Sequence, residues 1–237
     1  MTGLTHEFIP FPSREDAAGF CVRFIQGALE TALADKPTAS LMVSGGSTPG
    51  GVFEGLSKTD MEWARVIVGL VDERWVGPEN SASNEGLVRS KLLIGLSGAA
   101  GFLPMRTATK SLAEAARDRA RAYTPHCSPV DVIMLGMGED GHTASWFPGS
   151  KDLSEALNSD ETITALDASG CAVAGEHTQR MTLTGQVVAS AKAALLLIFG
   201  DRKKEIYETS LTATATDMPV KYAIDNLGPR LTVVWAP

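Results

Sequence analysis

The stretch from residue 130 to Pro148 constrains the fold of this chain more than any other part of its sequence. A short apolar run over 130–135 predicts a buried parallel strand, because such strands are covered on both faces. Three glycines, two carboxylates and His142 follow before the proline. In an open α/β sheet, ligands bind in the loops beyond the carboxyl ends of the strands. His142 is therefore a candidate acid or base near neutral pH, and the pattern indicates an enzyme.

The same loop offers a competing interpretation, because residues 136–141 have the G-x-G-x-x-G spacing of a dinucleotide-binding turn. Glu139 and Asp140 place negative charge where a pyrophosphate would lie. That motif also needs a helix that begins inside the loop and directs its N–H groups at the phosphates, and Pro148 leaves room only for a short turn or brief helix. The residues thus disfavour nucleotide binding, and we expect no cofactor.

Length and charge limit the remaining function classes. A chain of 237 residues with 44% hydrophobic and 21% charged residues has ample material for a core. No internal repeat or linker divides it, so a single domain over 1–237 is expected. The net charge of −7 disfavours binding to nucleic acid. An anionic substrate would have to be held by local positive groups, since the overall field repels it.

The cysteines and the hydropathy pattern predict a cytoplasmic protein. Cys21, Cys127 and Cys171 are odd in number and lack Cys-x-x-Cys spacing, which argues against a disulfide framework. The first residues lack a basic segment followed by an apolar core, so no signal peptide is expected. No apolar stretch is long enough to span a bilayer, and we expect no membrane partner.

Strands and helices are predicted to alternate along the chain. Apolar runs predict strands at 40–43, 66–71, 130–135, 163–166, 193–199 and 231–235. Capping signals and helical spacing predict helices at 13–33, 84–93, 111–123 and 185–191. Two more helices are expected, one with Thr48 as N-cap and Pro49 at its first position, the other capped by Asp201. This alternation predicts an α/β fold with a mostly parallel sheet and helices on both faces.

Several motifs, taken in order, resemble a known family. They are Ser44-Gly-Gly-Ser-Thr-Pro49, Asp72-Glu-Arg74, Asn84, the 135–148 loop with Asp140-Gly-His142, Arg180-Met-Thr-Leu-Thr184 and Gly200-x-x-Lys203. The set is similar to the 6-phosphogluconolactonase family, whose superfamily includes glucosamine-6-phosphate deaminase. The resemblance implies a three-layer, modified Rossmann-like fold and hydrolysis of 6-phosphoglucono-δ-lactone to 6-phosphogluconate in the oxidative pentose phosphate pathway.

Lactone hydrolysis requires a base that activates water and a group that stabilises an oxyanion. His142 is the candidate base, and either Asp140 or Glu73 is expected to orient its ring, as a carboxylate does in hydrolase triads. Arg74 follows a predicted strand end, where it would reach the developing oxyanion or another substrate oxygen. No His or Cys lies at ligand spacing near the carboxylates at 72–73, so no metal is expected.

The phosphate of the substrate needs a separate cradle. The loop Ser44, Gly45, Gly46, Ser47 and Thr48 offers backbone N–H groups, two hydroxyls and a helix N-terminus. The resemblance adds the cations Arg180 and Lys203 on the phosphate side, and substrate contacts from Asp72, Asn84 and Gly141.

Two alternatives remain open. A deaminase or isomerase of the same superfamily would share the cradle and the histidine loop, but the sequence after His142 lacks the Asn-Glu-Pro ending of the deaminase motif. A noncatalytic sugar-phosphate sensor would not need His142 and Asp140 together. We expect a sugar-phosphate substrate as the partner and a monomer or weak homodimer as the assembly.

Overall fold

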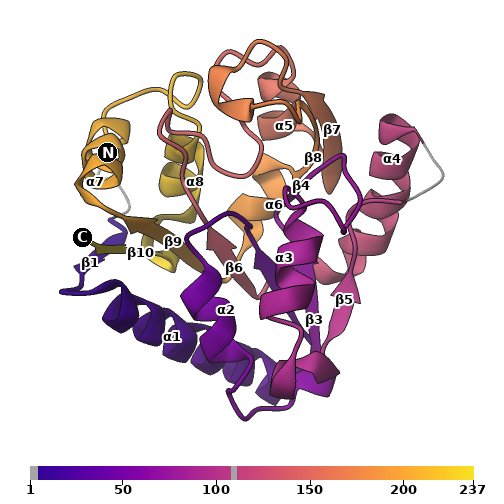
Figure 1. Cartoon of the computed structure of the whole chain (residues 1–237), viewed down its shortest axis with the longest axis vertical. Coiled ribbons are helices and arrows are strands. Elements are labelled where there is room, and N and C mark those ends of the chain that lie inside the picture. The colour runs from indigo at the N-terminus through magenta and orange to yellow at the C-terminus, as the bar shows by residue number, and fades with distance from the viewer. Residues whose placement is uncertain (1–4, 108–110) are drawn as a thin grey trace.

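The computed structural model describes residues 5–107 and 111–237, and a seven-stranded sheet forms its centre (Figure 1). The strand order is β1-β10-β9-β6-β2-β3-β5, and every neighbouring pair is parallel. The strands are β1 (Glu7–Pro10), β2 (Ala39–Val43), β3 (Val66–Leu70), β5 (Gly101–Leu103), β6 (Val132–Leu135), β9 (Ala193–Phe199) and β10 (Leu231–Ala236). The predicted α/β fold with a mostly parallel sheet is confirmed.

Helices connect these strands. They are α1 (Arg14–Asp35), α2 (Gly50–Leu56), α3 (Asn84–Lys91), α4 (Leu112–Tyr123), α5 (Leu153–Asn158), α6 (Gly185–Ser190), α7 (Asp201–Ser210) and α8 (Val220–Leu227). Ser13 caps α1 by accepting from the backbone N–H of Asp16, and Ser111 and Glu114 form the predicted capping box of α4. No helix in these two ranges is long and apolar enough to cross a membrane.

A second sheet, which the sequence did not predict, stands beside the first. Its order is β4 (Asp72–Arg74), β8 (Gln179–Leu183) and β7 (Ile163–Asp167), and both pairs are antiparallel. Val71 joins the two sheets, because its N–H donates to Val43 O in the large sheet and its carbonyl accepts from Leu183 N in the small one, at 2.9 and 2.8 Å. The chain therefore changes sheet between Leu70 and Asp72, immediately before the Asp-Glu-Arg motif.

Some predicted helix starts were wrong by one residue, and some elements were missed. Pro49, not Thr48, is the N-cap of α2, and Gly200, with φ of +86°, takes the place expected of Asp201 in α7. Asp201 lies instead in the first turn, where its charge favours the helix dipole. The strands β1 and β5 and the helices α5 and α8 were not predicted. β1 and β5 are short, partly exposed edge strands whose sequences lack a buried strand's apolar run.

A buried carboxylate ties the start of β6 to the elements around it. Asp131 accepts from Ser40 N at 2.8 Å and pairs with Lys36 and Lys192, at 2.5 and 3.3 Å. Burial raises the pKa of Asp131, but these partners together outweigh burial and hold it below its ordinary value of 3.8. A carboxyl group whose pKa is lower in the folded than in the unfolded state stabilises the fold at pH values above its unfolded-state pKa. This stabilisation is lost as the pH falls through the folded-state pKa.

We predict that Asp131→Asn lowers the free energy of unfolding at pH 7 by about 1–3 kcal/mol. The difference in free energy of unfolding between the variant and the wild type should shrink in urea denaturation curves recorded from pH 7 down to pH 3. The reason is that the wild-type carboxylate becomes protonated and loses its charge. The control is Glu54→Gln, which breaks an ion pair with Lys91 of the same 2.5 Å length but about half exposed, and should change little. Equal effects of both substitutions at pH 7 would contradict a special role for Asp131.

Candidate active site

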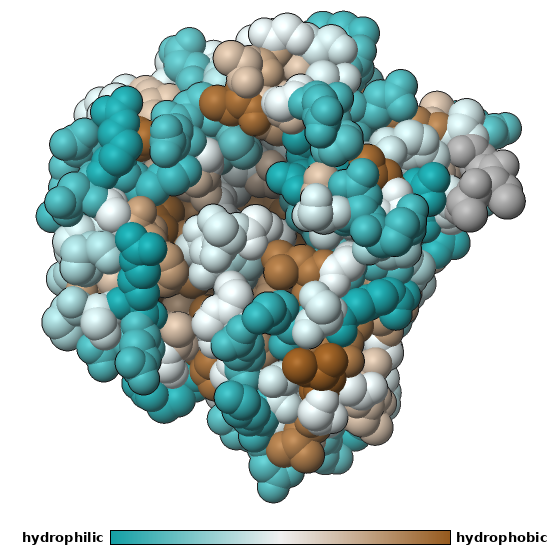
Figure 2. All heavy atoms as spheres, viewed as in Figure 1, coloured by the Kyte–Doolittle hydropathy of each residue, from teal (hydrophilic) through white to brown (hydrophobic). Residues whose placement is uncertain are grey.

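A cavity of about 370 Å³ opens where the loops after β2, β3 and β6 meet. Figure 2 shows a hollow in this face of the molecule. The predicted site residues that line the cavity are Ser44, Gly45, Gly46, Ser47, Thr48, Asp72, Arg74, Asn84, His142, Arg180 and Lys203. Gly141, Glu73 and Asp140 are not among its lining residues. The fold thus gathers most of the predicted residues at the carboxyl edge of the parallel sheet, where α/β proteins bind ligands.

His142 and Asp140 form a hydrogen-bonded pair. The distance from His142 Nδ1 to Asp140 Oδ1 is 2.5 Å, and the backbone N–H of His142 donates to the same oxygen at 3.1 Å. The imidazole also packs against Phe147, with ring centroids 4.6 Å apart. Burial raises the pKa of Asp140, but its hydrogen bonds with His142 outweigh burial and lower it from the ordinary value. Nδ1 is therefore occupied, and Nε2 is the ring nitrogen left for a ligand.

The glycines of the loop make this pair possible. The N–H of Gly138 donates to His142 O at 2.8 Å, which closes the loop, and Gly141 has a φ of +78° that favours glycine. A Cβ on Gly138 would lie 2.0 Å from His142 Nδ1 and 2.7 Å from Asp140 Oδ1. The G-x-G-x-x-G spacing of residues 136–141 therefore allows the imidazole of His142 to contact the carboxylate of Asp140.

Glu73 is placed away from His142. Its carboxylate is 2% exposed and accepts four hydrogen bonds, from the backbone N–H groups of Arg74, Asn84 and Glu85 and from Ser83 Oγ. Burial raises the pKa of Glu73, and these four hydrogen bonds oppose that rise. Glu73 therefore caps the N-terminus of α3, and of the two carboxylates considered for orienting the imidazole only Asp140 contacts it.

Two arginines lie opposite each other on neighbouring strands of the small sheet. Arg74 in β4 and Arg180 in β8 are direct cross-strand partners. Arg74 Nη1 donates to Ala82 O at 2.5 Å, and its buried Nε has no partner among the described residues. Arg180 is 4% exposed and donates from Nε to His177 O and from Nη2 to Ala174 O, at 2.6 and 2.9 Å. Burial lowers the pKa of Arg180 and so does Arg74, while Asp72 raises it.

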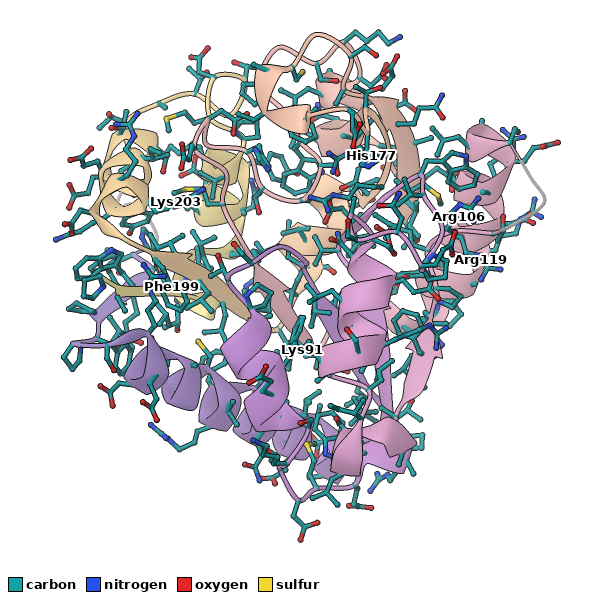
Figure 3. The ribbon with its side chains drawn as sticks, viewed as in Figure 1. Lys91, Arg106, Arg119, His177, Phe199 and Lys203 are labelled. Carbon is teal, nitrogen blue, oxygen red and sulfur yellow. The ribbon has the colours of Figure 1, made fainter. Side chains whose placement is uncertain are left out.

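Lys203 approaches the cavity from the other side. Figure 3 shows Lys203 on α7 at the left, well apart from His177, whose carbonyl holds Arg180. Its Nζ donates to Met137 O at 2.6 Å. Burial lowers the pKa of Lys203, and the nearby carboxylates of Glu139 and Asp140 raise it. The cavity thus has positive groups on two sides, although the chain carries a net charge of −7.

The loop after β2 forms a further part of the wall. Gly46 has a φ of +90°, and the N–H of Ser44 donates to Met134 O at 2.9 Å. A Cβ on Gly45 would lie 2.0 Å from Asn84 Oδ1, so only glycine fits against α3 here. This packing lets the backbone of the loop line the cavity, and its role as a phosphate cradle stays a prediction.

Sequence reasoning missed several residues of the site. Glu139, Phe147 and Val173 line the cavity, and Ser145 donates to Asp72 Oδ2 at 2.5 Å. Val173 lies in the 3-10 turn Ala172–Ala174, within a stretch that the sequence left without assignment. Within 5–107 and 111–237, no group of three or more His, Cys, Asp or Glu side chains is arranged to hold a metal ion.

Comparison with known proteins identifies the family. Residues 12–235 match the family described as glucosamine-6-phosphate isomerases/6-phosphogluconolactonase. The chain belongs to this family. Over 214 residues it is 41% identical to a 6-phosphogluconolactonase of Xylella fastidiosa, covering 90% of this chain and 89% of that protein. A Rhizobium meliloti protein of the same name is 40% identical over 88% of this chain and 89% of its own length.

Solved structures of the family have the same fold. The crystal structure of a 6-phosphogluconolactonase from Shewanella baltica superposes with a TM-score of 0.93, at 30% sequence identity over 99% of this chain and 100% of that one. A 6-phosphogluconolactonase from Thermotoga maritima gives a TM-score of 0.79 at 26% identity, over 98% of this chain and 99% of that one. The family fold therefore extends over nearly the whole chain.

We predict that Gly138→Ala separates His142 from Asp140 while the fold persists, because the added methyl group would overlap the imidazole. The nitrogen NMR signals of the His142 ring report the Nδ1 hydrogen bond directly and should shift. Gly136→Ala is the matched control in the same loop, since nothing lies within 4 Å of its added Cβ. Unchanged His142 signals in Gly138→Ala would show that the loop absorbs the methyl group.

Proposed function

We propose that this chain hydrolyses 6-phosphoglucono-δ-lactone to 6-phosphogluconate. The observation that carries the proposal is the imidazole of His142, held by Asp140 and open to a cavity that positive groups line. The sequence identity with proteins named 6-phosphogluconolactonase supports the same reaction. The cavity volume of about 370 Å³ also lies in the range of small-molecule sites.

In this mechanism His142 acts as the general base. Water attacks the lactone carbonyl carbon while Nε2 takes one of its protons, and the carbonyl oxygen becomes an oxyanion. The tetrahedral intermediate then expels the ring oxygen, which leaves as a hydroxyl group with the proton from His142. Asp140 keeps the ring in the required orientation and stabilises the imidazolium, a role that a carboxylate plays in hydrolase triads.

Arg74 is suited to stabilise the oxyanion. It lines the cavity, and its buried Nε has no partner among the described residues. A donor held in advance near the reacting carbonyl stabilises the charge that develops there. Glu73 contributes by fixing the backbone N–H groups of Arg74 and Asn84, and not by acting on His142.

The phosphate group is assigned to Lys203, Arg180 and the loop 44–48. An ammonium group binds phosphate as a point charge and a guanidinium group as a planar donor. Lys203 and Arg180 both line the cavity, and each keeps N–H groups beyond those bonded to backbone carbonyls. The glycine loop adds backbone donors beside them.

A deaminase or isomerase activity is the alternative within the family. The names of the most similar relatives and the segment Thr143-Ala-Ser-Trp-Phe-Pro148, which lacks the deaminase ending, favour the lactonase. Incubation with glucosamine 6-phosphate should release no ammonia. We also propose a cytoplasmic location, consistent with three free cysteines, and a monomer or weak homodimer, which light scattering of purified protein would test.

We predict that His142→Asn lowers kcat by about 100-fold or more, because removal of a general base has typically this effect. The assay is stopped-flow hydrolysis of freshly generated lactone, corrected for the spontaneous reaction. The variant should still bind 6-phosphogluconate in calorimetry. His126→Asn, in the 3-10 turn Thr124–His126 and outside the cavity, should keep wild-type turnover. Wild-type kcat in His142→Asn would rule out this base.

We predict that Lys203→Ala and Arg180→Ala each raise KM for the phosphorylated lactone by about tenfold or more, since charge-assisted contacts contribute roughly 1.5–3 kcal/mol. Turnover of unphosphorylated glucono-δ-lactone should change little, because that substrate lacks the phosphate. Lys204→Ala is the control on the same helix, since Lys204 packs on Trp235 and does not line the cavity. Equal losses of activity on both lactones would show that these cations contribute to folding or to the chemical step and not to phosphate binding.

A further inference from the structure

One corner of the cavity has no part in the mechanism above, and Asp72 forms its centre. Asp72 is 7% exposed and lines the cavity at the start of β4. Its Oδ2 accepts from Ser145 Oγ at 2.5 Å, and its Oδ1 accepts from Asn84 Nδ2 at 3.2 Å. The same amide nitrogen donates to Asp72 O at 2.8 Å. One donor on each oxygen fixes the plane of the carboxylate.

Ser145 reaches Asp72 from behind the cavity wall. The residue is fully buried and is not among the lining residues. A tight turn delivers it, in which Trp146 N donates to Thr143 O at 3.0 Å and Ala144 has a φ of +52°, which is rare for a residue with a side chain. Trp146 Nε1 then anchors the turn to Leu183 O at 3.0 Å. Ser145 therefore contacts a ligand only through Asp72.

The carboxylate of Asp72 is a hydrogen-bond acceptor at the cavity lining. A carboxylate offers about four lone-pair sites, of which Ser145 and Asn84 fill two in Asp72. Buried acceptors without donors are costly unless a ligand supplies the donors. The corner therefore suits a group that donates.

The preference of this corner for a hydrogen-bond donor distinguishes between the polar groups of a sugar lactone. The phosphate and the lactone carbonyl offer only acceptors at neutral pH, so the Asp72 carboxylate disfavours them. The ring hydroxyls are the donors of such a molecule. Arg180, Arg74 and Lys203 also line the cavity but offer only donors, so the Asp72 carboxylate and the cations favour different groups of the substrate.

We propose that Asp72 accepts a hydrogen bond from a ring hydroxyl of the lactone, and that Ser145 is the positioning residue that holds Asp72 for this contact. The inference rests on the proposed lactone hydrolysis and adds a ring hydroxyl to the substrate groups that the site recognises. A site built to bond a substrate hydroxyl rejects the analogue that lacks it, because its own buried polar group is then left unpaired.

The test compares 6-phosphoglucono-δ-lactone with its 2-deoxy, 3-deoxy and 4-deoxy analogues, using wild type, Ser145→Ala and Asp72→Asn. Wild type should disfavour one analogue by about tenfold or more in kcat/KM. Ser145→Ala should lose about tenfold on the full substrate and less than twofold on that analogue, because the contact it supports is already absent. Asp72→Asn should behave in the same way, and it carries the test if Ser145→Ala does not fold.

Ser97→Ala is the matched control, since it also removes a fully buried serine hydroxyl, one that donates to Leu92 O away from the cavity. It should leave the ratio between the two substrates unchanged even where it lowers stability. If Ser145→Ala lowers kcat/KM equally for the full substrate and for every analogue, Ser145 has only a structural role and the proposal is overturned. The proposal is also overturned if the wild type has the same kcat/KM for the full substrate and all three deoxy analogues. Absence of lactone hydrolysis by wild type would instead overturn the proposed function itself.

Discussion

The arrangement of the site depends on the two backbone hydrogen bonds of Val71. Its N–H continues the parallel sheet through Val43, while its carbonyl starts the antiparallel sheet through Leu183. A residue shared by two sheets must turn the chain, so the three residues that follow leave the main sheet at its carboxyl edge. Asp72 and Arg74 then face the cavity while Glu73 points to the start of α3. The alternation of side chains along a strand thus divides this motif between the cavity and the scaffold.

Glu73 illustrates how a buried charge supports a site without touching a ligand. The first turn of α3 presents N–H groups that have no carbonyl partner within the helix, and burial keeps water away from them. The Glu73 carboxylate takes two of these N–H groups and the Ser83 hydroxyl. Asn84 is thereby fixed at the helix start, where its amide reaches Asp72. The cap of α3 therefore helps to fix the Asp72 carboxylate at the cavity.

Much of the fold could be predicted because the central strands are apolar runs between capping and glycine signals. β6 and β9 carry that signal in full, whereas the edge strand β1 and the short β5 do not. The small sheet escaped prediction because β4 follows β3 after one residue and looks like its continuation. Antiparallel pairing of β4 with β8 depends on contacts about a hundred residues apart, which no local pattern encodes.

The same distinction applies to the site. Asp140 and His142 are two residues apart, so their pairing follows from the loop itself. The contact between Ser145 and Asp72 spans 73 residues and exists only because the turn at Ala144 meets the small sheet. A buried serine in a recognisable loop also has no charge or spacing that distinguishes it from a structural one. Sequence patterns thus indicated the chemistry, and the fold was needed to show which groups hold it in place.

The distribution of charge explains how an acidic protein can hold an anionic sugar. Arg74 and Arg180 lie directly opposite each other in the small sheet, an arrangement in which like charges repel. Burial weakens the screening by water, and the nearby carboxylates of Asp72 and Glu73 offset part of this repulsion. With a net charge of −7, the protein offers no long-range attraction for such a ligand. Under the proposed function, recognition therefore acts at short range, through the cations that line the cavity from α7 and the small sheet.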